Sequence, residues 1–257
     1  MAWIELDGAV NVRDLGGLPT EDGGKTADAR LLRGENLQEL SPADIAMLVG
    51  EIGLTTVVDL RSSDELALEG PAPLDSVAGV LHVHHPVLPE AGSATDADVD
   101  VLLTRADRDR SRYPDDPICG HYLGYLEGRP DQVAAAVRSI ARSQGAALVH
   151  CAAGKDRTGV VVAIALSAVG VRRQAVIADY AATGERIGPL LARLRRSPTY
   201  ASDISSEPDE LQRPRPQTMA AFLEQVASRY GGAVPWLASH GFGRDDLQLL
   251  HARLLRS

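Results

Sequence analysis

The sequence predicts an α/β protein in which a central, mainly parallel sheet is flanked by helices. Short apolar runs with strand character alternate with segments of helical spacing through the middle of the chain, which is typical of βαβ units. The apolar run 146–149 leads through a short loop into a second apolar run, 160–168, and so indicates a strand-loop-helix unit. Ligands of parallel sheets bind beyond the carboxyl ends of the strands. We therefore expect a site in the loop after residue 149.

Each element has a local signal. Ser41-Pro42 before an apolar-periodic run is typical of a helix N-cap and first turn, and Gly53 is a suitable stop for that helix. The patterns that follow predict a strand over Thr55–Leu60, a helix over Ser63–Glu69, a strand over Gly79–His85 and a helix over Asp131–Ser143. The last of these helices leads into the strand 146–150.

The C-terminal part, Thr218–Arg256, predicts two or three amphipathic helices. The length of 257 residues suits a single domain, 1–257, with one sizeable core. Two segments interrupt the α/β pattern, about 89–128 and about 184–217, and the second contains a stretch rich in Ser, Pro and charge. Long insertions near a site often form lids, so either segment could contribute a helical lid.

The ten-residue run His150–Gly159 has the chemistry of a phosphate-ester site. A loop that enters a helix N-terminus turns backbone N–H groups inward, where they bind an oxyanion with help from the helix dipole. Gly154 lets the backbone close around the bound group, and Arg157 offers a planar fork that matches two phosphate oxygens. The same positive field favours the thiolate of Cys151, which is then able to attack phosphorus.

These residues resemble the signature of the cysteine-based protein tyrosine phosphatase superfamily, which is His-Cys, five residues, Arg and Thr or Ser. The ending Gly-Lys-Asp-Arg-Thr-Gly is similar to bacterial tyrosine-phosphatase-like proteins of the mycobacterial secreted type, which have phosphoinositide activity. A second segment, Asn11–Gly17, resembles the N-terminal Asn-x-Arg-Asp-x-Gly-Gly motif of that family. Three further segments occur in the order found in the family: Arg30–Gly34, Val57–Arg61 and Asp179-Tyr180. A weaker similarity lies near the C-terminus, at Tyr230–Gly232.

The resemblance implies a tyrosine-phosphatase-like fold and a role for each loop residue. Cys151 would be the nucleophile that forms a phospho-cysteine intermediate, and Arg157 would bind phosphate and stabilise the transition state. Thr158 could donate its hydroxyl to the sulfur, and His150 is expected to order the loop through its ring N–H. The other residues of the phosphate-binding loop are Ala152, Ala153, Gly154 and Lys155.

Several aspartates could protonate the leaving group. The resemblance favours Asp156, inside the loop, although its cationic neighbours favour the carboxylate. Asp115 or Asp116 follows Tyr113-Pro114, similar to the Pro-Asp pair of superfamily members with a mobile acid loop. Asp59, at a strand end, is a third candidate, and pairing with a nearby arginine is its simpler role. The motif does not choose among them.

Other charged groups have competing interpretations. Arg13 and Asp14 could pair and tie the N-terminal segment to the body of the protein, or they could contact substrate. His82 and His84 share one strand face, but no carboxylate or cysteine at ligand spacing accompanies them, so no metal site is expected. The basic stretch 186–196 could be a solvated face, or it could steer inositol headgroups or contact a membrane surface.

Composition limits the class of protein. Hydrophobic and charged contents of 44% and 24% are ordinary for a globular protein, and a net charge of −9 argues against a nucleic-acid binder. Only Lys25 and Lys155 are lysines among the 26 basic residues, which suggests that a compact ammonium suits the loop. Two cysteines form no disulfide framework, and Met1–Glu5 lacks the start of a signal peptide. The expected location is cytoplasmic, or exported without a signal peptide.

The sequence therefore predicts a phosphomonoesterase that needs no cofactor or metal. Its substrates would be phosphotyrosine, with dual specificity as an extension, or phosphoinositides. Lys155 would suit a multiply phosphorylated inositol, and Asp156 partly cancels its charge. The alternative is a pseudophosphatase that binds phosphorylated ligands without turnover, against which the intact loop argues. Arsenate reductases and rhodanese-like enzymes also use an anion-cradled thiolate, but the His-Cys…Arg-Thr-Gly frame fits neither well.

Overall fold

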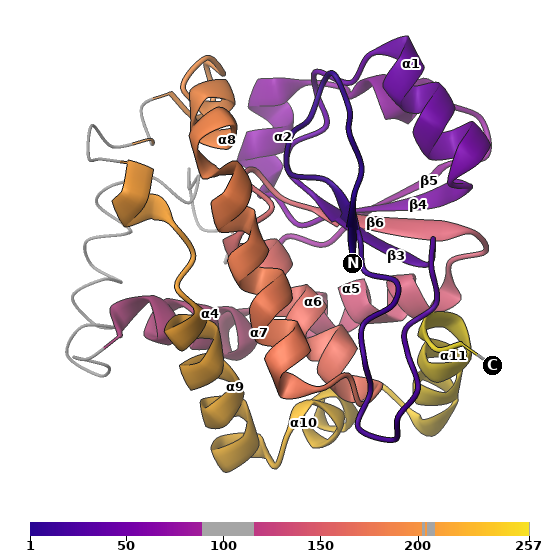
Figure 1. Ribbon diagram of the computed structural model, residues 1–257, viewed down its shortest axis with the longest axis vertical. Coiled ribbons are helices and arrows are strands. Elements are labelled where there is room, and N and C mark those ends of the chain that lie inside the picture. The colour runs from indigo at the N-terminus through magenta and orange to yellow at the C-terminus, as the bar shows by residue number, and fades with distance from the viewer. Residues whose placement is uncertain (89–115, 202–203, 205–208, 257) are drawn as a thin grey trace.

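A six-stranded mixed sheet forms the centre of the protein (Figure 1). The computed structural model describes residues 1–88, 116–201, 204 and 209–256. The strand order is β1-β2-β3-β6-β4-β5; the last four of these strands are parallel, and β1 and β2 add an antiparallel edge. The strands are β1 (Ala2–Trp3), β2 (Arg13–Asp14), β3 (Leu31–Gly34), β4 (Leu54–Asp59), β5 (Leu81–His84) and β6 (Ala146–His150).

Helices cover both faces of this sheet (Figure 1). One face carries α1 (Pro42–Ile45), the π-helix η1 (Ala46–Glu51), α2 (Ser63–Glu69) and the 3₁₀ turn η2 (Pro73–Ser76). The other face carries α4 (Pro117–Gly128), α5 (Pro130–Arg142), α6 (Asp156–Ala168), α7 (Arg173–Ala182), α9 (Pro216–Tyr230), α10 (Ala233–Ser239) and α11 (Arg244–Leu254). The remaining turns and helix are η3 (Thr183–Arg186), α8 (Ile187–Leu194) and η4 (Asp209–Gln212).

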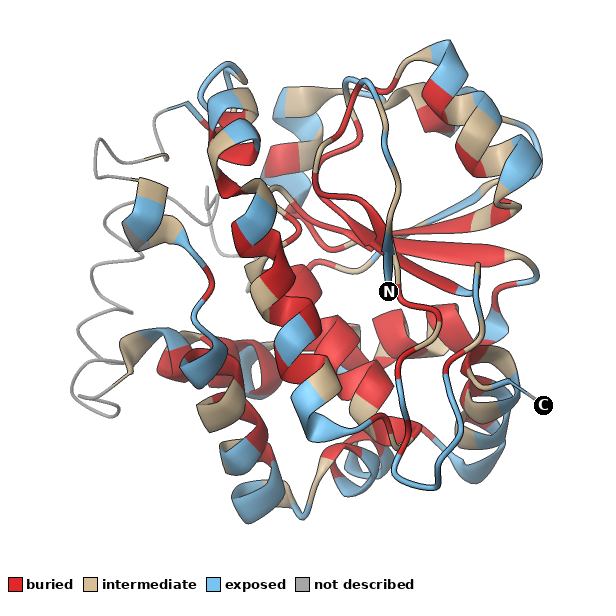
Figure 2. Ribbon diagram, viewed as in Figure 1, coloured by how far each residue is buried: buried red, intermediate tan, exposed pale blue. Residues whose placement is uncertain are grey.

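Alternation along the strands divides the core into two layers. In β6, Leu148 packs into the layer beneath η1, whereas Val149 packs into the layer beneath α5 and α6. The neighbouring strands alternate in the same way, with Leu31 and Val58 on one face and Leu32 and Val57 on the other. Because both faces are covered, β3 and β6 are buried throughout their length and β4 is buried at four of its six residues (Figure 2). The predicted α/β fold with a mainly parallel sheet is confirmed.

Local signals account for the element boundaries. Ser41 forms a capping box with Asp44 at the start of α1, and Gly53 follows η1 with a left-handed φ of +77°. The strand and helix predicted over 55–60 and 63–69 are β4 and α2. The C-terminal part forms three helices, α9 to α11, of which α9 begins two residues before the predicted start at Thr218.

The two segments considered as lids are only partly described. In the first, residues 89–115 lie outside the described residues, and the described remainder is mostly α4, which packs into the core beside α6 and α9. In the second, η3, α8 and η4 are described, and residues 202–203 and 205–208 are not. The lid therefore stays a prediction.

Candidate active site

The loop 151–155 joins the buried strand β6 to the N-terminus of α6. Strand β6 lies between β3 and β4, so the loop emerges at the centre of the sheet's carboxyl edge. Helix α6 is apolar on all sides and almost wholly buried. Because β6 and α6 are both buried, they fix the position of the loop backbone and therefore of the Cα atoms that carry its side chains.

The rest of the fold holds the loop by its carbonyl oxygens. Three successive carbonyls accept hydrogen bonds from outside the loop: Ala152 from the backbone N–H of Asn36 (2.8 Å), Ala153 from Asn11 Nδ2 (2.8 Å) and Gly154 from Arg33 Nη2 (2.6 Å). In a planar trans peptide, the C=O and the following N–H point in opposite directions. Anchoring the oxygens outside therefore turns the next amide N–H groups inward, as an anion cradle requires.

Gly154 is required by the close approach of the neighbouring strand. Its φ is +66°, and a Cβ built there would lie 2.3 Å from the carbonyl oxygen of Gly34. A side chain would therefore both strain the backbone and push the loop away from β3.

A buried cluster of charges ties the N-terminal segment to the loop. Asp179 on α7 accepts from Arg13 Nε at 2.8 Å and from Arg33 Nη1 at 2.6 Å. Although burial opposes ionisation, the two guanidinium groups hold the pKa of Asp179 below its ordinary value. Arg13 also donates to Asn11 Oδ1 at 2.7 Å, which orients the amide that holds the loop.

Arg13 does not pair with Asp14, which was one of the two interpretations of these residues. Adjacent residues in β2 point to opposite sides of the sheet, so only Arg13 reaches the buried Asp179. Asp14 instead accepts from the backbone N–H groups of Gly16 and Ala29. Arg13 is fully buried, and its described contacts support the loop from outside the cavity.

Arg157 is locked in place by Glu65. Its Nη1 and Nη2 donate to Oε2 and Oε1 of Glu65 at 2.6 and 2.9 Å, and both side chains are fully buried. Glu65 also accepts from the backbone N–H of Ser62 at 2.7 Å in the capping box of α2. The start of α2 and the guanidinium of the loop therefore share one carboxylate.

Cys151 and Arg157 face a common cavity of about 150 Å³. Its polar floor is the loop, and its walls include Leu191 and Leu194 of α8 and the ring of Tyr200. These side chains belong to a small apolar cluster that packs directly against Ala152 and Ala153. The cavity thus combines the polar loop with apolar walls.

Asp156 is the one candidate acid that lines this cavity among the described residues. Its Oδ1 accepts the hydroxyl of Tyr122, and its Oδ2 lies 3.6 Å from Lys155 Nζ. Lys155 also donates to the backbone oxygen of Gln212 at 3.2 Å. The ammonium therefore lies between the loop and η4, with its charge partly balanced by Asp156.

The other predicted acids lie elsewhere. Asp59 pairs with Arg61 at 2.6 Å and borders a separate cavity of about 510 Å³. Asp116 caps α4 by accepting from the backbone N–H of Cys119 at 3.1 Å. Asp115 lies outside the described residues. Of the candidates that can be located, the fold brings Asp156 alone to Cys151.

His150 is buried below the loop. Its Nδ1 lies 3.3 Å from the carbonyl oxygen of Cys151, and its Nε2 lies 3.5 Å from Asp59 Oδ2. Burial lowers the pKa of His150 to about 4, so the ring is neutral at pH 7. A neutral ring donates one N–H, which agrees with a role in ordering the loop.

The bond expected from Thr158 to the sulfur is not formed. Thr158 lies in the first turn of α6, where the helical backbone restricts its χ1. Its buried Oγ1 has no hydrogen-bond partner within the part of the chain that the structure describes.

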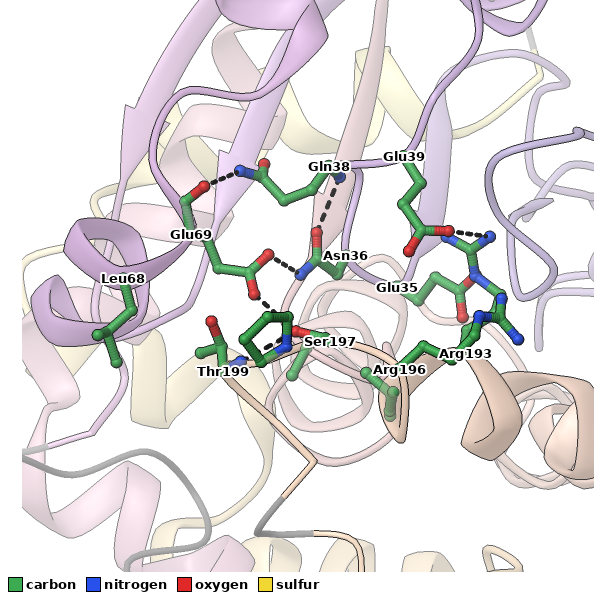
Figure 3. Close-up of a pocket in the computed structure, with 13 residues that line it drawn as sticks. Glu35, Asn36, Gln38, Glu39, Leu68, Glu69, Arg193, Arg196, Ser197 and Thr199 are labelled. Atoms are coloured by element: carbon green, nitrogen blue, oxygen red, sulfur yellow. Dashed lines mark hydrogen bonds and ion pairs between the residues drawn. The ribbon is translucent and has the colours of Figure 1, made fainter.

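A second cavity, of about 280 Å³, is lined by Glu35 and Arg193 among others (Figure 3). It shares Ala152 and Leu194 with the first cavity. Glu35, directly after β3, accepts from the backbone N–H of Val10 at 2.6 Å and lies 3.2 Å from Arg193 Nε on α8. Burial raises the pKa of Glu35 to about 7. This carboxyl joins the N-terminal segment to the helix that walls the catalytic cavity.

The remaining predicted groups are engaged in local contacts. His82 pairs with Asp75 at 3.0 Å, and the described residues contain no cluster able to hold a metal ion. The basic stretch is largely paired within the protein: Arg186 with Glu5, Arg193 with Glu35 and Glu39, and Arg195 with Asp209. None of the described helices is long and apolar enough to cross a membrane.

Several site residues were not predicted as such. Glu65 could be found only as the glutamate that ends a Ser-x-x-Glu capping box, a signal for a helix start. No local sequence pattern indicated that Tyr122, in α4, belongs to the site, because it contacts Asp156, which lies 34 residues further along the chain. Arg33 and Asp179 lay in family-like segments, but no local pattern identified them as partners.

A loop of this form, on the carboxyl edge of a mostly parallel sheet, defines the class of α/β enzymes that bind phosphate esters in an anion cradle. The family model described as "Tyrosine phosphatase family" matches residues 4–256. The chain belongs to this family and is a phosphoric monoester hydrolase of the tyrosine-phosphatase type.

Similar bacterial proteins support the assignment. The triple specificity protein phosphatase PtpB of Mycobacterium tuberculosis is 27% identical over 280 residues, covering 99% of this chain and 100% of its own. The tyrosine-protein phosphatase of Nostoc commune is 28% identical over 237 residues, 89% of this chain and 74% of its own. A relative from Cupriavidus necator is 33% identical over 184 residues, 71% of this chain and 63% of its own.

Proposed function

We propose that the protein hydrolyses phosphate monoesters through a phospho-cysteine intermediate on Cys151. The observation that carries this proposal is the shared cavity, which Cys151 and Arg157 both line beside a loop whose carbonyls are held from outside. A preorganised cradle stabilises the charge of the transferring phosphoryl group without reorganising during the reaction. Glu65 supplies that preorganisation for Arg157.

The chemistry takes two steps. The Cys151 thiolate attacks phosphorus, the bond to the leaving oxygen breaks, and Asp156 gives that oxygen its proton. A water molecule then attacks the phospho-cysteine, Asp156 takes a proton from it, and the sulfur–phosphorus bond breaks to release inorganic phosphate. The position of Asp156 beside Cys151 supports its use as acid and then base.

Aryl phosphates are the substrates that the cavity walls favour. Leu191, Leu194 and Tyr200 offer apolar surface to a phenyl ring whose phosphate lies in the loop. Phosphoinositides are the second substrate class that we propose, because Lys155 adds an ammonium to the rim. The printed name of the Mycobacterium tuberculosis relative, a triple specificity phosphatase, supports a broad substrate panel for this chain.

The decisive experiment measures turnover of p-nitrophenyl phosphate. We expect activity that survives a metal chelator, falls to background in Cys151→Ser and is retained in Cys119→Ser, which changes the other free cysteine. Arg157→Lys keeps the charge but loses the fork, so its kcat/KM should fall on the order of 100-fold or more. A wild-type protein that binds phosphotyrosine peptide without turnover would instead identify a pseudophosphatase. Phosphotyrosine and phosphoserine peptides and a phosphoinositide would then rank the substrates.

A further inference from the structure

Two buried tyrosines connect the core to Asp156. The hydroxyl of Tyr122, on α4, donates to Asp156 Oδ1, and the hydroxyl oxygens of Tyr122 and Tyr180, on α7, are 2.7 Å apart. Both tyrosines are buried, at 0% and 2% exposure, and their rings meet edge to face with centroids 6.0 Å apart. Three helices thereby meet at one carboxylate.

The direction of these hydrogen bonds follows from the number of hydrogens. A phenol has one hydrogen, so when Tyr122 gives its hydrogen to the carboxylate, its oxygen must accept the hydrogen of Tyr180. Burial raises the pKa of both phenols far above neutrality, and the charge of Asp156 acts in the same direction. Both therefore stay protonated and act as neutral donors in an ordered chain.

The chain fixes one oxygen of Asp156 and leaves the other near the catalytic cavity. With Oδ1 held by Tyr122, Oδ2 lies 3.6 Å from Lys155 Nζ. The side chain of Asp156 keeps 27% exposure, so without this anchor the carboxyl would be free to rotate toward solvent. Small displacements of a catalytic group cost large factors in rate.

We propose that Tyr122, oriented by Tyr180, is a positioning residue that holds Asp156 for proton transfer to and from the reacting oxygens. This inference rests on the proposed role of Asp156. Tyr122 is not one of the residues that line the cavity, and its hydrogen bond to that lining is made to Asp156.

The same helix offers a matched control. Tyr125 lies almost one turn further along α4, is 2% exposed and stacks on Tyr122 with ring centroids 6.1 Å apart. Its hydroxyl lies 2.8 Å from His121 Nε2, whereas the hydroxyl of Tyr122 donates to Asp156. Tyr125→Phe therefore removes a comparable buried hydroxyl from the same core without touching Asp156.

The test compares kcat on two esters that differ in leaving group. p-Nitrophenolate leaves readily without a proton, whereas phenolate from phenyl phosphate needs one. For Tyr122→Phe we expect kcat on phenyl phosphate to fall about tenfold relative to kcat on p-nitrophenyl phosphate, with KM for both unchanged. Tyr125→Phe should leave the ratio at its wild-type value. In an Asp156→Asn background, adding Tyr122→Phe should not change the ratio further.

The possible results distinguish failure of the positioning role of Tyr122 from failure of the proposed phosphatase mechanism. If Asp156→Asn shifts the ratio and Tyr122→Phe does not, the positioning role is overturned and the phosphatase mechanism stands. If Asp156→Asn leaves the ratio unchanged, both the acid assignment and the positioning role fail, while loss of activity in Cys151→Ser would still support the nucleophile. If Tyr122→Phe does not fold, Tyr180→Phe decides the matter, with an expected shift of about threefold in the same direction.

Discussion

The carboxyl of Glu35 should make the stability of this protein depend on pH in a predictable window. It is 2% exposed, and burial raises its pKa from an ordinary 4.5 to about 7. Only one of its oxygens is well satisfied, because Oε1 accepts from Val10 and faces Arg193, whereas Oε2 has no partner among the described residues. Ionisation therefore costs more in the folded state than in the unfolded state.

Proton binding by Glu35 in the folded and unfolded states sets how the free energy of unfolding changes with pH. Well below pH 4.5 the Glu35 carboxyl is protonated in both the folded and the unfolded state, so it does not lower the free energy of unfolding. Between pH 4.5 and 7 the unfolded chain releases this proton first, so the folded state binds more protons and stability falls as pH rises. Above about pH 8 the loss is complete. Each pH unit between the two pKa values is worth about 1.4 kcal/mol, so the total loss is about 3 kcal/mol.

Glu35→Gln should remove that dependence. Glutamine can still accept from Val10, and it carries no charge at any pH. We expect the free energy of unfolding of the variant, relative to wild type, to rise by about 3 kcal/mol between pH 4.5 and 8. For a chain of this size, that corresponds to a relative gain in Tm of about 6 to 12 °C.

Thermal and urea unfolding at matched pH values from 4 to 8 would measure the difference. Glu39→Gln is the control, because Glu39 pairs with the same Arg193 at 3.0 Å while its own side chain is 51% exposed. Its difference from wild type should change little across the range. A Glu35→Gln difference that is the same at pH 4.5 and at pH 8 would refute the reasoning.

Three further substitutions test how the loop is held. Glu65→Gln removes the buried carboxylate that accepts two hydrogen bonds from Arg157, so unfolding measurements should show a loss of about 3 kcal/mol. Its kcat/KM should also fall on the order of 100-fold, and an unchanged melting temperature would contradict this. Asp179→Asn removes the charge shared by two buried arginines and should cost about 3–5 kcal/mol by urea titration. Gly154→Ala should abolish turnover of p-nitrophenyl phosphate, whereas Gly170→Ala, with φ +76° and open space around it, should cost only about 1 kcal/mol and keep activity.

Short-range signals in the sequence were sufficient for the framework of the fold. The helix from Ser41 to Gly53 was predicted because its cap and its stop are local, and both occur as expected. The strand before Cys151 and the helix after it were predicted from their continuous apolar runs, which reflect burial on all sides. Elements of this kind depend on residues a few positions apart, so a single sequence contains the information.

Partners of buried charges could not be predicted in the same way. Arg157 pairs with a residue 92 positions away, and Arg13 with one 166 positions away. The sequence offered Asp14 as a partner for Arg13 only because it is adjacent, with contact to substrate as the other interpretation, but neighbouring residues in a β-strand point to opposite faces. Which carboxylate meets a buried guanidinium is decided by the packing of whole helices, and that packing has no local signature.

The buried charges around the loop are better explained by preorganisation than by stability. Asp179 orients two arginines, of which Arg33 holds the loop at Gly154 and Arg13 orients the Asn11 amide that holds Ala153. Glu65 holds Arg157 in the first turn of α6. Burying such pairs costs folding free energy that well-packed apolar side chains would avoid. What they provide is a loop whose carbonyls and guanidinium are fixed before substrate arrives, so that binding a phosphate needs little rearrangement. Glu65 also caps α2, so a displacement of that helix should move the carboxylate that holds Arg157.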